Sequence, residues 1–387
     1  MMKENLLKKI LLFSAVGIAL TGCVSETHVS TEESNKQITF EVAKYKPTTR
    51  AEFSTDETFG TFAYKKKNNE GGHTTFMNNI KIKHYSGGYW AAEDENAYMW
   101  EANSHIDFIS YAPYNIDADN SVVPKISDNG SGSKNQLKYE GVTVDEFNQV
   151  DLLYGDKAVC QTHNTNNFGY TGVPTLFHHA LAKLNFRFTI SCTSNFGVVG
   201  STDALRYWQV KVTSIKIENI YKKGDVTLLL EDDSHNSMTT KKWNNQNTTN
   251  NVWTPVTEGE DAICSKEWTV EGGQEALSSL QIFGSEGNKA ENYYVLPQVL
   301  EVGKQKITVK YKVSTSTNVD GPWTAAGGER TGEMYFRNLT AVAAWEMGKN
   351  ITYTIVIDPT KEAIHFAPSV ESWNDAIGTG TSGDIKF

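Results

Sequence analysis

The sequence contains few cysteines and no apolar run long enough to span a membrane. Only four of its 387 residues are cysteine, which excludes a disulfide-rich scaffold. Its most continuous apolar run, Leu11–Leu20, has about half of the roughly 20 residues that a transmembrane helix needs. We therefore expect no permanent transmembrane helix.

Signatures of catalysis and of metal binding are also missing. The sequence has no H-E-x-x-H, no G-x-S-x-G and no P-loop. His178 and His179 are adjacent, and neighbouring side chains on a strand point to opposite faces, which disfavours a shared ion. We predict no catalytic residue, no metal site and no cofactor.

Acidic residues outnumber basic ones, with 46 Asp and Glu against 36 Lys and Arg and a net charge of −10. The phosphates of nucleic acid would repel such a chain. We therefore expect no nucleic-acid partner.

The N-terminus has the pattern of a lipoprotein signal peptide. Positive charges at Lys3, Lys8 and Lys9 precede the apolar run, which leads into Leu20-Thr21-Gly22-Cys23. A cysteine after two small residues is the position at which bacteria attach lipid, and several acyl chains give lasting membrane attachment. We predict that residues 1–22 are removed and that Cys23 is acylated, with palmitate among its chains.

Val24 stands where an inner-membrane retention signal would carry Asp, so we expect the outer membrane as the destination. Residues 23–37 are polar and rich in Ser, Thr and Glu, a composition too poor in apolar residues to fold. They are predicted to be a tether.

Three cysteines, Cys160, Cys192 and Cys264, are left after lipidation. Their number is odd and no C-x-x-C spacing occurs. They are expected to be buried free thiols, or one pair with one spare.

Alternation of apolar and polar residues indicates an all-β fold. It is clearest in four segments, which begin at Ile38, Leu184, Ile307 and Ile351, and a period of two with one solvated face is typical of antiparallel sheet. The length suits two β-sandwiches in series. We place one at residues 38–173 and the other at 174–387, with the boundary at Gly172-Val173-Pro174.

Three local features are also predicted. The alternation of Val210 and Val212 slips by one residue before Ile215, which predicts a bulge or a bend near Thr213-Ser214. Gly224-Asp225 is interpreted as a turn, and Val144–Leu153 as a short helix.

Motifs in the middle and at the end of the chain carry a family likeness. Asp151–Gly155 and Leu176–Phe186, followed by Trp345–Ile355 and Val370–Trp373, resemble the signatures of the fimbrillin family, the lipoprotein pilins of Bacteroidales-type (type V) fimbriae. Thr48-Thr49-Arg50-Ala51 near the mature N-terminus fits the same family.

The resemblance implies two transthyretin-like β-sandwich domains and assembly by donor-strand exchange. In that scheme a protease removes a subunit's first strand, and an extended segment of a neighbour fills the groove. Here the removable strand would be Ile38–Lys46, with Ile38, Phe40 and Val42 on its apolar face, and Arg50–Ala51 would be the cleavage site, unless Arg50 is an ordinary solvated arginine.

The candidate donor is Ala376–Phe387, with Ile385 and Phe387 on one face. The expected function is that of a structural or tip subunit of a surface fimbria that serves cell adhesion. Its partners would be other fimbrial subunits in a homo- or heteropolymer, the outer membrane through the lipid anchor, and a host or bacterial surface receptor.

Two alternatives come from other classes of protein. A monomeric surface glycan-binding lipoprotein would display exposed coplanar aromatic rings, and a hydrolase would bring carboxylates together in a cleft.

Overall fold

The structure is a computed structural model that describes most of the chain between residues 36 and 372. The described ranges are 36–42, 56–67, 72–94, 98–114, 123–128, 134–147, 149–163, 172–175, 177–196, 205–230, 252–259, 262–277, 281–283, 293–339, 342–361 and 363–372.

A nine-stranded sheet forms the N-terminal part of the molecule. Its strands in spatial order are β10 (Val173–Thr175), β1 (Thr39–Val42), β4 (Tyr89–Ala92), β3 (Thr74–Tyr85), β2 (Thr58–Lys67), β5 (Ser104–Ala112), β8 (Leu153–Gly155) and β11 (Phe177–His179), with β9 (Ala158–Gln161) also on β5.

This sheet curls until its two ends meet. The end strands β10 and β11 are separated in the sequence by one residue, and one residue spans less than about 8 Å. Phe177 of β11 accordingly reaches the ring of Phe59 on β2, with 5.5 Å between the centroids. The curl encloses an apolar core that includes Ile38, Phe40 and Phe108.

A four-stranded sheet covers the outer face of β2, β5 and β8. It consists of β16 (Thr254–Pro255), β15 (Lys223–Leu229), β7 (Lys134–Thr143) and β6 (Lys125–Asp128). A second core lies between the two sheets and includes Tyr111, Tyr139 and Leu228. Leu181 and Leu296 also belong to it, so this core extends to the C-terminal part.

The C-terminal part is a sandwich of two sheets around a third core. One sheet contains β18 (Gln281–Ile282), β19 (Tyr293–Val295), β12 (Ala182–Ile190), β25 (Lys349–Asp358) and β26 (Ala363–Ser372). The other contains β13 (Ser194–Phe196), β14 (Leu205–Tyr221), β17 (Ile263–Glu275), β21 (Lys306–Ser316), β22 (Thr324–Ala325) and β23 (Arg330–Tyr335). A short ladder joins β20 (Gln298–Val299) to β24 (Ala344–Trp345), and the 3-10 turn η1 covers Phe336–Asn338.

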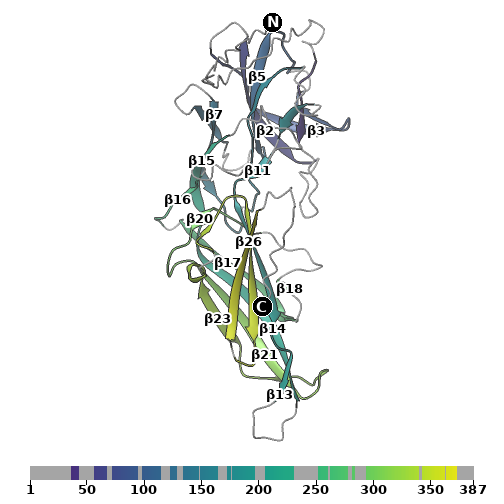
Figure 1. Cartoon of the computed structure of the whole chain (residues 1–387), viewed down its shortest axis with the longest axis vertical. Helices are drawn as coiled ribbons and strands as arrows, with labels where there is room; N and C mark the ends of the chain where they lie inside the picture. Colours follow the sequence, from purple (N-terminus) through teal and green to yellow (C-terminus); the bar gives the residue numbers. More distant parts are fainter. Residues whose placement is uncertain are drawn as a thin grey trace, which may run out of the picture.

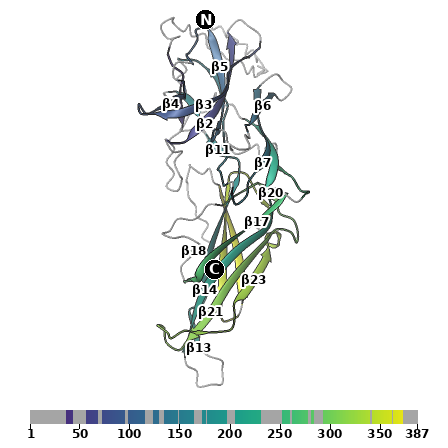
Figure 2. The ribbon, with the colours of Figure 1, turned by 180° about the vertical axis from the view of Figure 1, so that it is seen from behind.

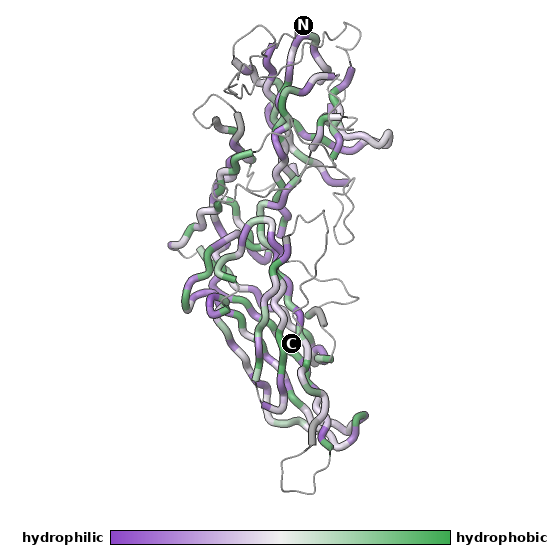
Figure 3. The backbone as a smooth tube through the Cα atoms, viewed as in Figure 1, coloured by the Kyte–Doolittle hydropathy of each residue, from purple (hydrophilic) through white to green (hydrophobic). Residues whose placement is uncertain are grey.

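The molecule is elongated, with the two parts end to end and β15 and β16 at its waist (Figure 1). The reverse view shows the β3–β4 hairpin projecting sideways from the N-terminal part (Figure 2). Apolar and polar residues alternate along the long strands of the C-terminal part (Figure 3), as expected for sheets with one face in a core.

The expected all-β fold of sandwiches is confirmed, and so are the four alternating segments. In β12, Leu184, Phe186, Phe188 and Ile190 are all buried. Two pairings, β1 with β10 and β12 with β25, are parallel. The slip in β14 is a bulge within one continuous strand, because its register with β17 and with β21 shifts between Val212 and Ser214.

The predicted turn at Gly224-Asp225 is wrong. Both residues lie within β15, and the chain leaves β14 at Lys222. Gly224 instead lets β16 approach closely, since a Cβ there would lie 2.9 Å from the carbonyl oxygen of Thr254. The Asp225 carboxylate accepts a hydrogen bond from the Gly141 amide at 2.6 Å.

The helix predicted at Val144–Leu153 is also wrong. The described residues of this segment are irregular, and β8 begins at Leu153. The Asp145 carboxylate accepts a hydrogen bond from the Phe147 amide at 3.0 Å, a local turn that competes with helix formation. Val144 and Leu152 are buried in the core between the N-terminal sheets, which explains their apolar character.

Strand pairing crosses the expected boundary after residue 173. That boundary falls within β10, and both β10 and β11 belong to the N-terminal sheet. Farther along the chain, β15 returns to pair with β7. The chain therefore passes from the N-terminal part to the C-terminal part twice.

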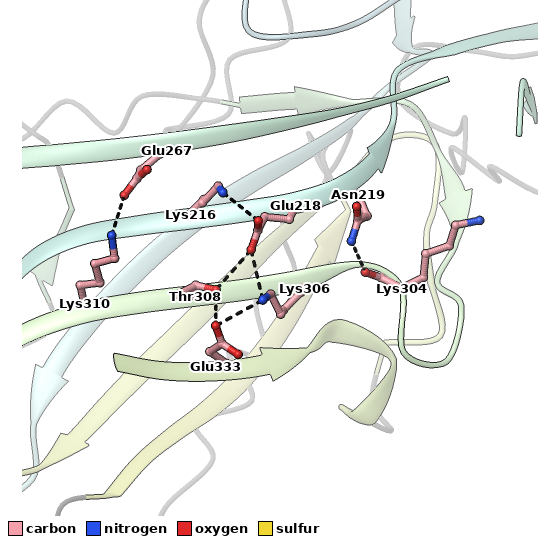
Figure 4. A network of polar contacts seen from close by, with 9 residues as sticks. All are labelled: Lys216, Glu218, Asn219, Glu267, Lys304, Lys306, Thr308, Lys310 and Glu333. Atoms are coloured by element: carbon pink, nitrogen blue, oxygen red, sulfur yellow. Dashed lines mark hydrogen bonds and ion pairs between the residues drawn. The ribbon is translucent and has the colours of Figure 1, made fainter. Parts of the chain in front are cut away.

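Charged side chains link four strands of the C-terminal part (Figure 4). Lys306 on β21 lies 3.4 Å from a carboxylate oxygen of Glu218 on β14 and 3.2 Å from one of Glu333 on β23. Lys216 donates a hydrogen bond to Glu218 at 2.7 Å, which lowers the pKa of that carboxyl. A separate ion pair joins Lys310 on β21 to Glu267 on β17 at 3.7 Å (Figure 4).

We expect Gly60→Ala to destabilise the protein by about 1–3 kcal/mol through overpacking. A Cβ at Gly60 would lie 2.2 Å from Tyr111 Cε1. The Tyr111 ring is fully buried, and its hydroxyl donates to Asn79 Oδ1 at 2.6 Å, so the ring has no room to move. Urea unfolding measures the effect, and Gly328→Ala is the control because its Cβ would meet nothing within 4 Å. Equal midpoints for the two variants would contradict this packing.

Glu218→Gln is expected to lower stability near pH 7 by about 0.2–1 kcal/mol and to have a progressively smaller effect as the pH falls below the unfolded-state pKa. The lowered pKa of Glu218 means that its contribution is present above the unfolded-state pKa and is lost as the pH falls through the folded-state pKa. Denaturant unfolding at several pH values tests this, with the exposed Glu258→Gln as control. A difference in stability that does not shrink as the pH is lowered would show that the carboxylate's charge is not the cause.

Candidate functional site

Strand β1 lies between two other strands of the N-terminal sheet. It pairs antiparallel with β4, where Phe40 faces Trp90. On its other side it pairs parallel with β10, from Phe40 opposite Val173 to Val42 opposite Thr175. Removal of β1 would therefore expose the edges of two strands at once.

The side chains of β1 that point into the core fill two pockets. Ile38, directly before the strand, is 1% exposed and Phe40 is 2% exposed. The Phe40 ring packs edge-on against Phe59 and Phe108, at centroid distances of 5.6 and 5.5 Å. Such burial stabilises by about 1.5–3 kcal/mol per side chain. Val42 is only half-buried.

Residues before β1 extend this ladder. The Ile38 amide donates to the Tyr98 carbonyl at 3.1 Å, and the Trp100 amide donates to the Lys36 carbonyl at 2.9 Å. Gln37 forms an isolated bridge with Met99. The strand is therefore held by backbone hydrogen bonds from Lys36 onward.

Gly172 brings a second backbone against β1. A Cβ at Gly172 would lie 2.8 Å from the Thr39 carbonyl oxygen and 3.0 Å from the Phe40 carbonyl carbon. Both atoms are backbone, so any extended segment in this position would meet Gly172 in the same way.

The structure brings three of the expected strand-exchange residues, Ile38, Phe40 and Val42, together around β1. Residues 43–46 of the expected removable strand lie outside the described residues. So do Cys23, Arg50, Ala51, Ile385 and Phe387.

The adjacent histidines each pair with an aspartate. His178 Nε2 lies 2.9 Å from Asp156 Oδ1, and His179 Nδ1 lies 2.9 Å from Asp151 Oδ1. Both imidazoles are largely buried, with side chains 11% and 12% exposed. The two central motifs thus bind each other along the β8–β11 ladder.

The first closing motif, Trp345–Ile355, forms part of the C-terminal core. Trp345 Nε1 donates to the Tyr353 hydroxyl at 2.9 Å, and both rings are buried. Phe336 packs against both rings, at centroid distances of 5.2 and 4.8 Å. Burial raises the pKa of Tyr353, so its hydroxyl stays protonated as a neutral hydrogen-bond partner.

Sequence reasoning missed two glutamines: Gln149 joins the N-terminal part to the C-terminal part, and Gln298 joins β20 to β14 within the C-terminal part. The Gln298 amide accepts from the Tyr221 N–H and donates to the Tyr221 carbonyl, both at 3.1 Å. Gln149 does the same with Tyr294, at 2.7 and 3.2 Å. Each glutamine side chain thus makes the two hydrogen bonds that the backbone of a neighbouring strand would otherwise make. Nothing local in the sequence distinguishes these residues from surface glutamines.

The described residues contain no group of three or more His, Cys, Asp or Glu side chains able to hold a metal ion. Within the same residues, no helix is both long and apolar enough to cross a bilayer. Cys192 and Cys264 are free thiols, and burial raises the pKa of Cys264 to about 11, which keeps it protonated and weakly nucleophilic at neutral pH.

Among solved structures, the chain is similar to a fimbrial protein from Bacteroides vulgatus ATCC 8482. The two are 18% identical with a TM-score of 0.52, over 88% of this chain and 100% of the other, and share a fold. A fimbrial assembly protein from Parabacteroides distasonis ATCC 8503 is 9% identical, with a TM-score of 0.36 over 87% and 98% of the chains. The tip fimbrial protein Mfa3 from Porphyromonas gingivalis is 10% identical, with a TM-score of 0.33 over 87% and 98%.

No curated protein matches the sequence significantly. The sequence does match the fimbrillin-like family over residues 48–373, a range that contains both central motifs and the closing motifs as far as Trp373. The resemblance seen in the sequence is therefore confirmed, and the chain belongs to the fimbrillin-like family.

Proposed function

We propose that this chain is a lipid-anchored structural subunit of a surface fimbria, without catalytic activity, that binds its neighbours by strand exchange at the position of β1. One observation carries the proposal. A short strand near the mature N-terminus is hydrogen-bonded on both sides and fills two core pockets. Its loss would leave a groove that another extended segment can fill.

The C-terminal segment has the side-chain spacing that this groove requires. Ile38-Thr39-Phe40 places its two apolar residues in the pockets, and Ile385-Lys386-Phe387 repeats the pattern Ile-x-Phe. Period-two alternation puts Ile385 and Phe387 on one face of a strand. A second copy of this chain is therefore the simplest donor, and another fimbrial subunit with the same pattern is the alternative.

Arg50 is suitably placed for release of β1. It follows the last described residue of the strand, Val42, by eight positions and precedes β2, which begins at Thr58. Cleavage between Arg50 and Ala51 would break the backbone between β1 and β2, while the hydrogen bonds of β1 would keep it in place until a donor displaces it.

The glycan-binding alternative gains no support from the aromatic pair at the β3–β4 hairpin. Tyr85 and Tyr89 are stacked, with centroids 5.5 Å apart and 16° between the planes. Lys83 lies over the Tyr85 ring at 4.9 Å, and the backbone of Gly87 lies against Tyr89. The rings therefore pack on their own hairpin and do not form an open platform.

Strand exchange predicts that a peptide of residues 376–387 displaces the fragment that carries β1 from protein cut by an arginine-specific protease. Peptide binding and fragment release are measured together by fluorescence anisotropy and size exclusion. Ile385→Ser with Phe387→Ser should weaken binding at least about a hundredfold, because two buried side chains contribute about 3–5 kcal/mol.

Lys386→Ala, which changes the opposite face of the peptide, is the matched control and should bind normally. Cut protein that loses its fragment and binds none of the peptides would rule out residues 376–387 as the donor for the groove at β1. In cells, removal of residues 376–387 should stop fibre extension. Fibres of normal length would mean that the subunit sits at the tip or donates by another segment.

Lipidation is tested separately. Cys23→Ala should leave an uncleaved precursor that is not anchored in the outer membrane, because the acceptor thiol is gone. Metabolic labelling with a radioactive fatty acid measures this, with Cys192→Ala as a control that keeps the label. Label in the Cys23→Ala protein would contradict the assignment.

A further inference from the structure

Both ends of the C-terminal part lie next to the N-terminal part. At the start of β12, the Leu181 carbonyl accepts a hydrogen bond from the Gly348 amide at 2.9 Å. Strand β25 runs parallel to β12 from the pair Lys183–Asn350 onward. Strand β26 returns antiparallel, so that Ser372 faces Lys349. The chain therefore enters and leaves this sheet at the same end.

Strand β26 is the most weakly held of these three strands. Among the described strands it pairs only with β25, and Pro368 has no N–H to donate. Ser369, Val370 and Glu371 are exposed, Val370 at 47%. Only farther from Ser372 does the strand reach the core, through Phe366, which is 8% exposed.

The contacts between the N-terminal and C-terminal parts are more extensive than those that hold β26. Leu181 and Leu296 share one apolar core. The Gln149 side chain adds two hydrogen bonds with the backbone of Tyr294, and Trp253 Nε1 donates to the Ala180 carbonyl at 2.7 Å. Pulling on the N-terminal part therefore moves β12 and β25 with it.

We infer that β26 detaches from β25 when the molecule is pulled along its length, before the rest of the C-terminal part unfolds. A pull between the N-terminal part and the residues after Ser372 acts along the long axis of the molecule (Figure 1). On Ser372 this force points back along β26 toward Ala363. The strand is then peeled from β25 one pair at a time, and the bonds are never loaded together.

Release of β26 leaves β25 paired with β12 over eight residue pairs and removes only Phe366 and the partly buried Ile364 from the core. The C-terminal part can therefore lengthen before it unfolds. The peeling is a property of the single chain. Its role in letting a fibre lengthen under tension rests on the proposed function.

Optical-trap stretching of the full chain, held at its N-terminal and C-terminal residues, tests the inference. Each residue released moves the point at which β26 separates from β25 by one strand rise. It also adds one residue of extended chain to the end-to-end length. Ten residues should give a reversible first step of about 65 Å, at lower force than unfolding.

Two disulfides locate the step. Asn350→Cys with Glu371→Cys joins directly opposed residues near Ser372 and should abolish the step under oxidising conditions. Val356→Cys with His365→Cys joins the pair near the other end and should shorten it to about 45 Å, because seven residues stay free to peel. Reduction should restore the full length in both variants.

A step that persists with residues 350 and 371 linked, or unfolding of the whole sandwich as the first event, would overturn the inference. If the step is present but cut protein binds no donor peptide, strand exchange alone fails.

Discussion

The two hydrogen-bond ladders of β1 hold the N-terminal sheet closed. Without this strand, β4 and β10 would face each other across an open gap, and the core would lose Ile38 and Phe40. The curl of the sheet depends on the same closure, because β10 and β11 follow each other in the chain and must remain adjacent. A strand of four residues therefore closes the sheet between β4 and β10, although it precedes all the other strands in the sequence.

The motifs that carry the family likeness stabilise the fold. Asp151 and Asp156 bind the two histidines of β11, and Trp345 binds Tyr353 inside the C-terminal core. None of these groups gathers into a reactive cluster, and their hydrogen bonds are made within the chain. Under the proposed function, recognition takes place at strand edges, where backbone groups supply affinity and alternate side chains supply register.

Period-two patterns in the sequence predicted the strands with apolar cores on one face, because burial imposes that spacing directly. The bulge in β14 was visible for the same reason, since an extra residue shifts the pattern. Gly224 was misread because a glycine that permits a close approach of two strands looks like a glycine that permits a turn. The partners of His178 and His179, and the pairing of Gln298 with Tyr221, depend on contacts between distant segments, which have no local signature.

The parallel pairing of β12 with β25 also shapes how the chain must fold. Leu184 and its partner Ile351 are separated by most of the C-terminal sequence, so the contact order of this part is high and its folding correspondingly slow. The Phe186 ring lacks its stacking partner Tyr353 until β25 has joined β12. That interval is when aggregation competes with folding.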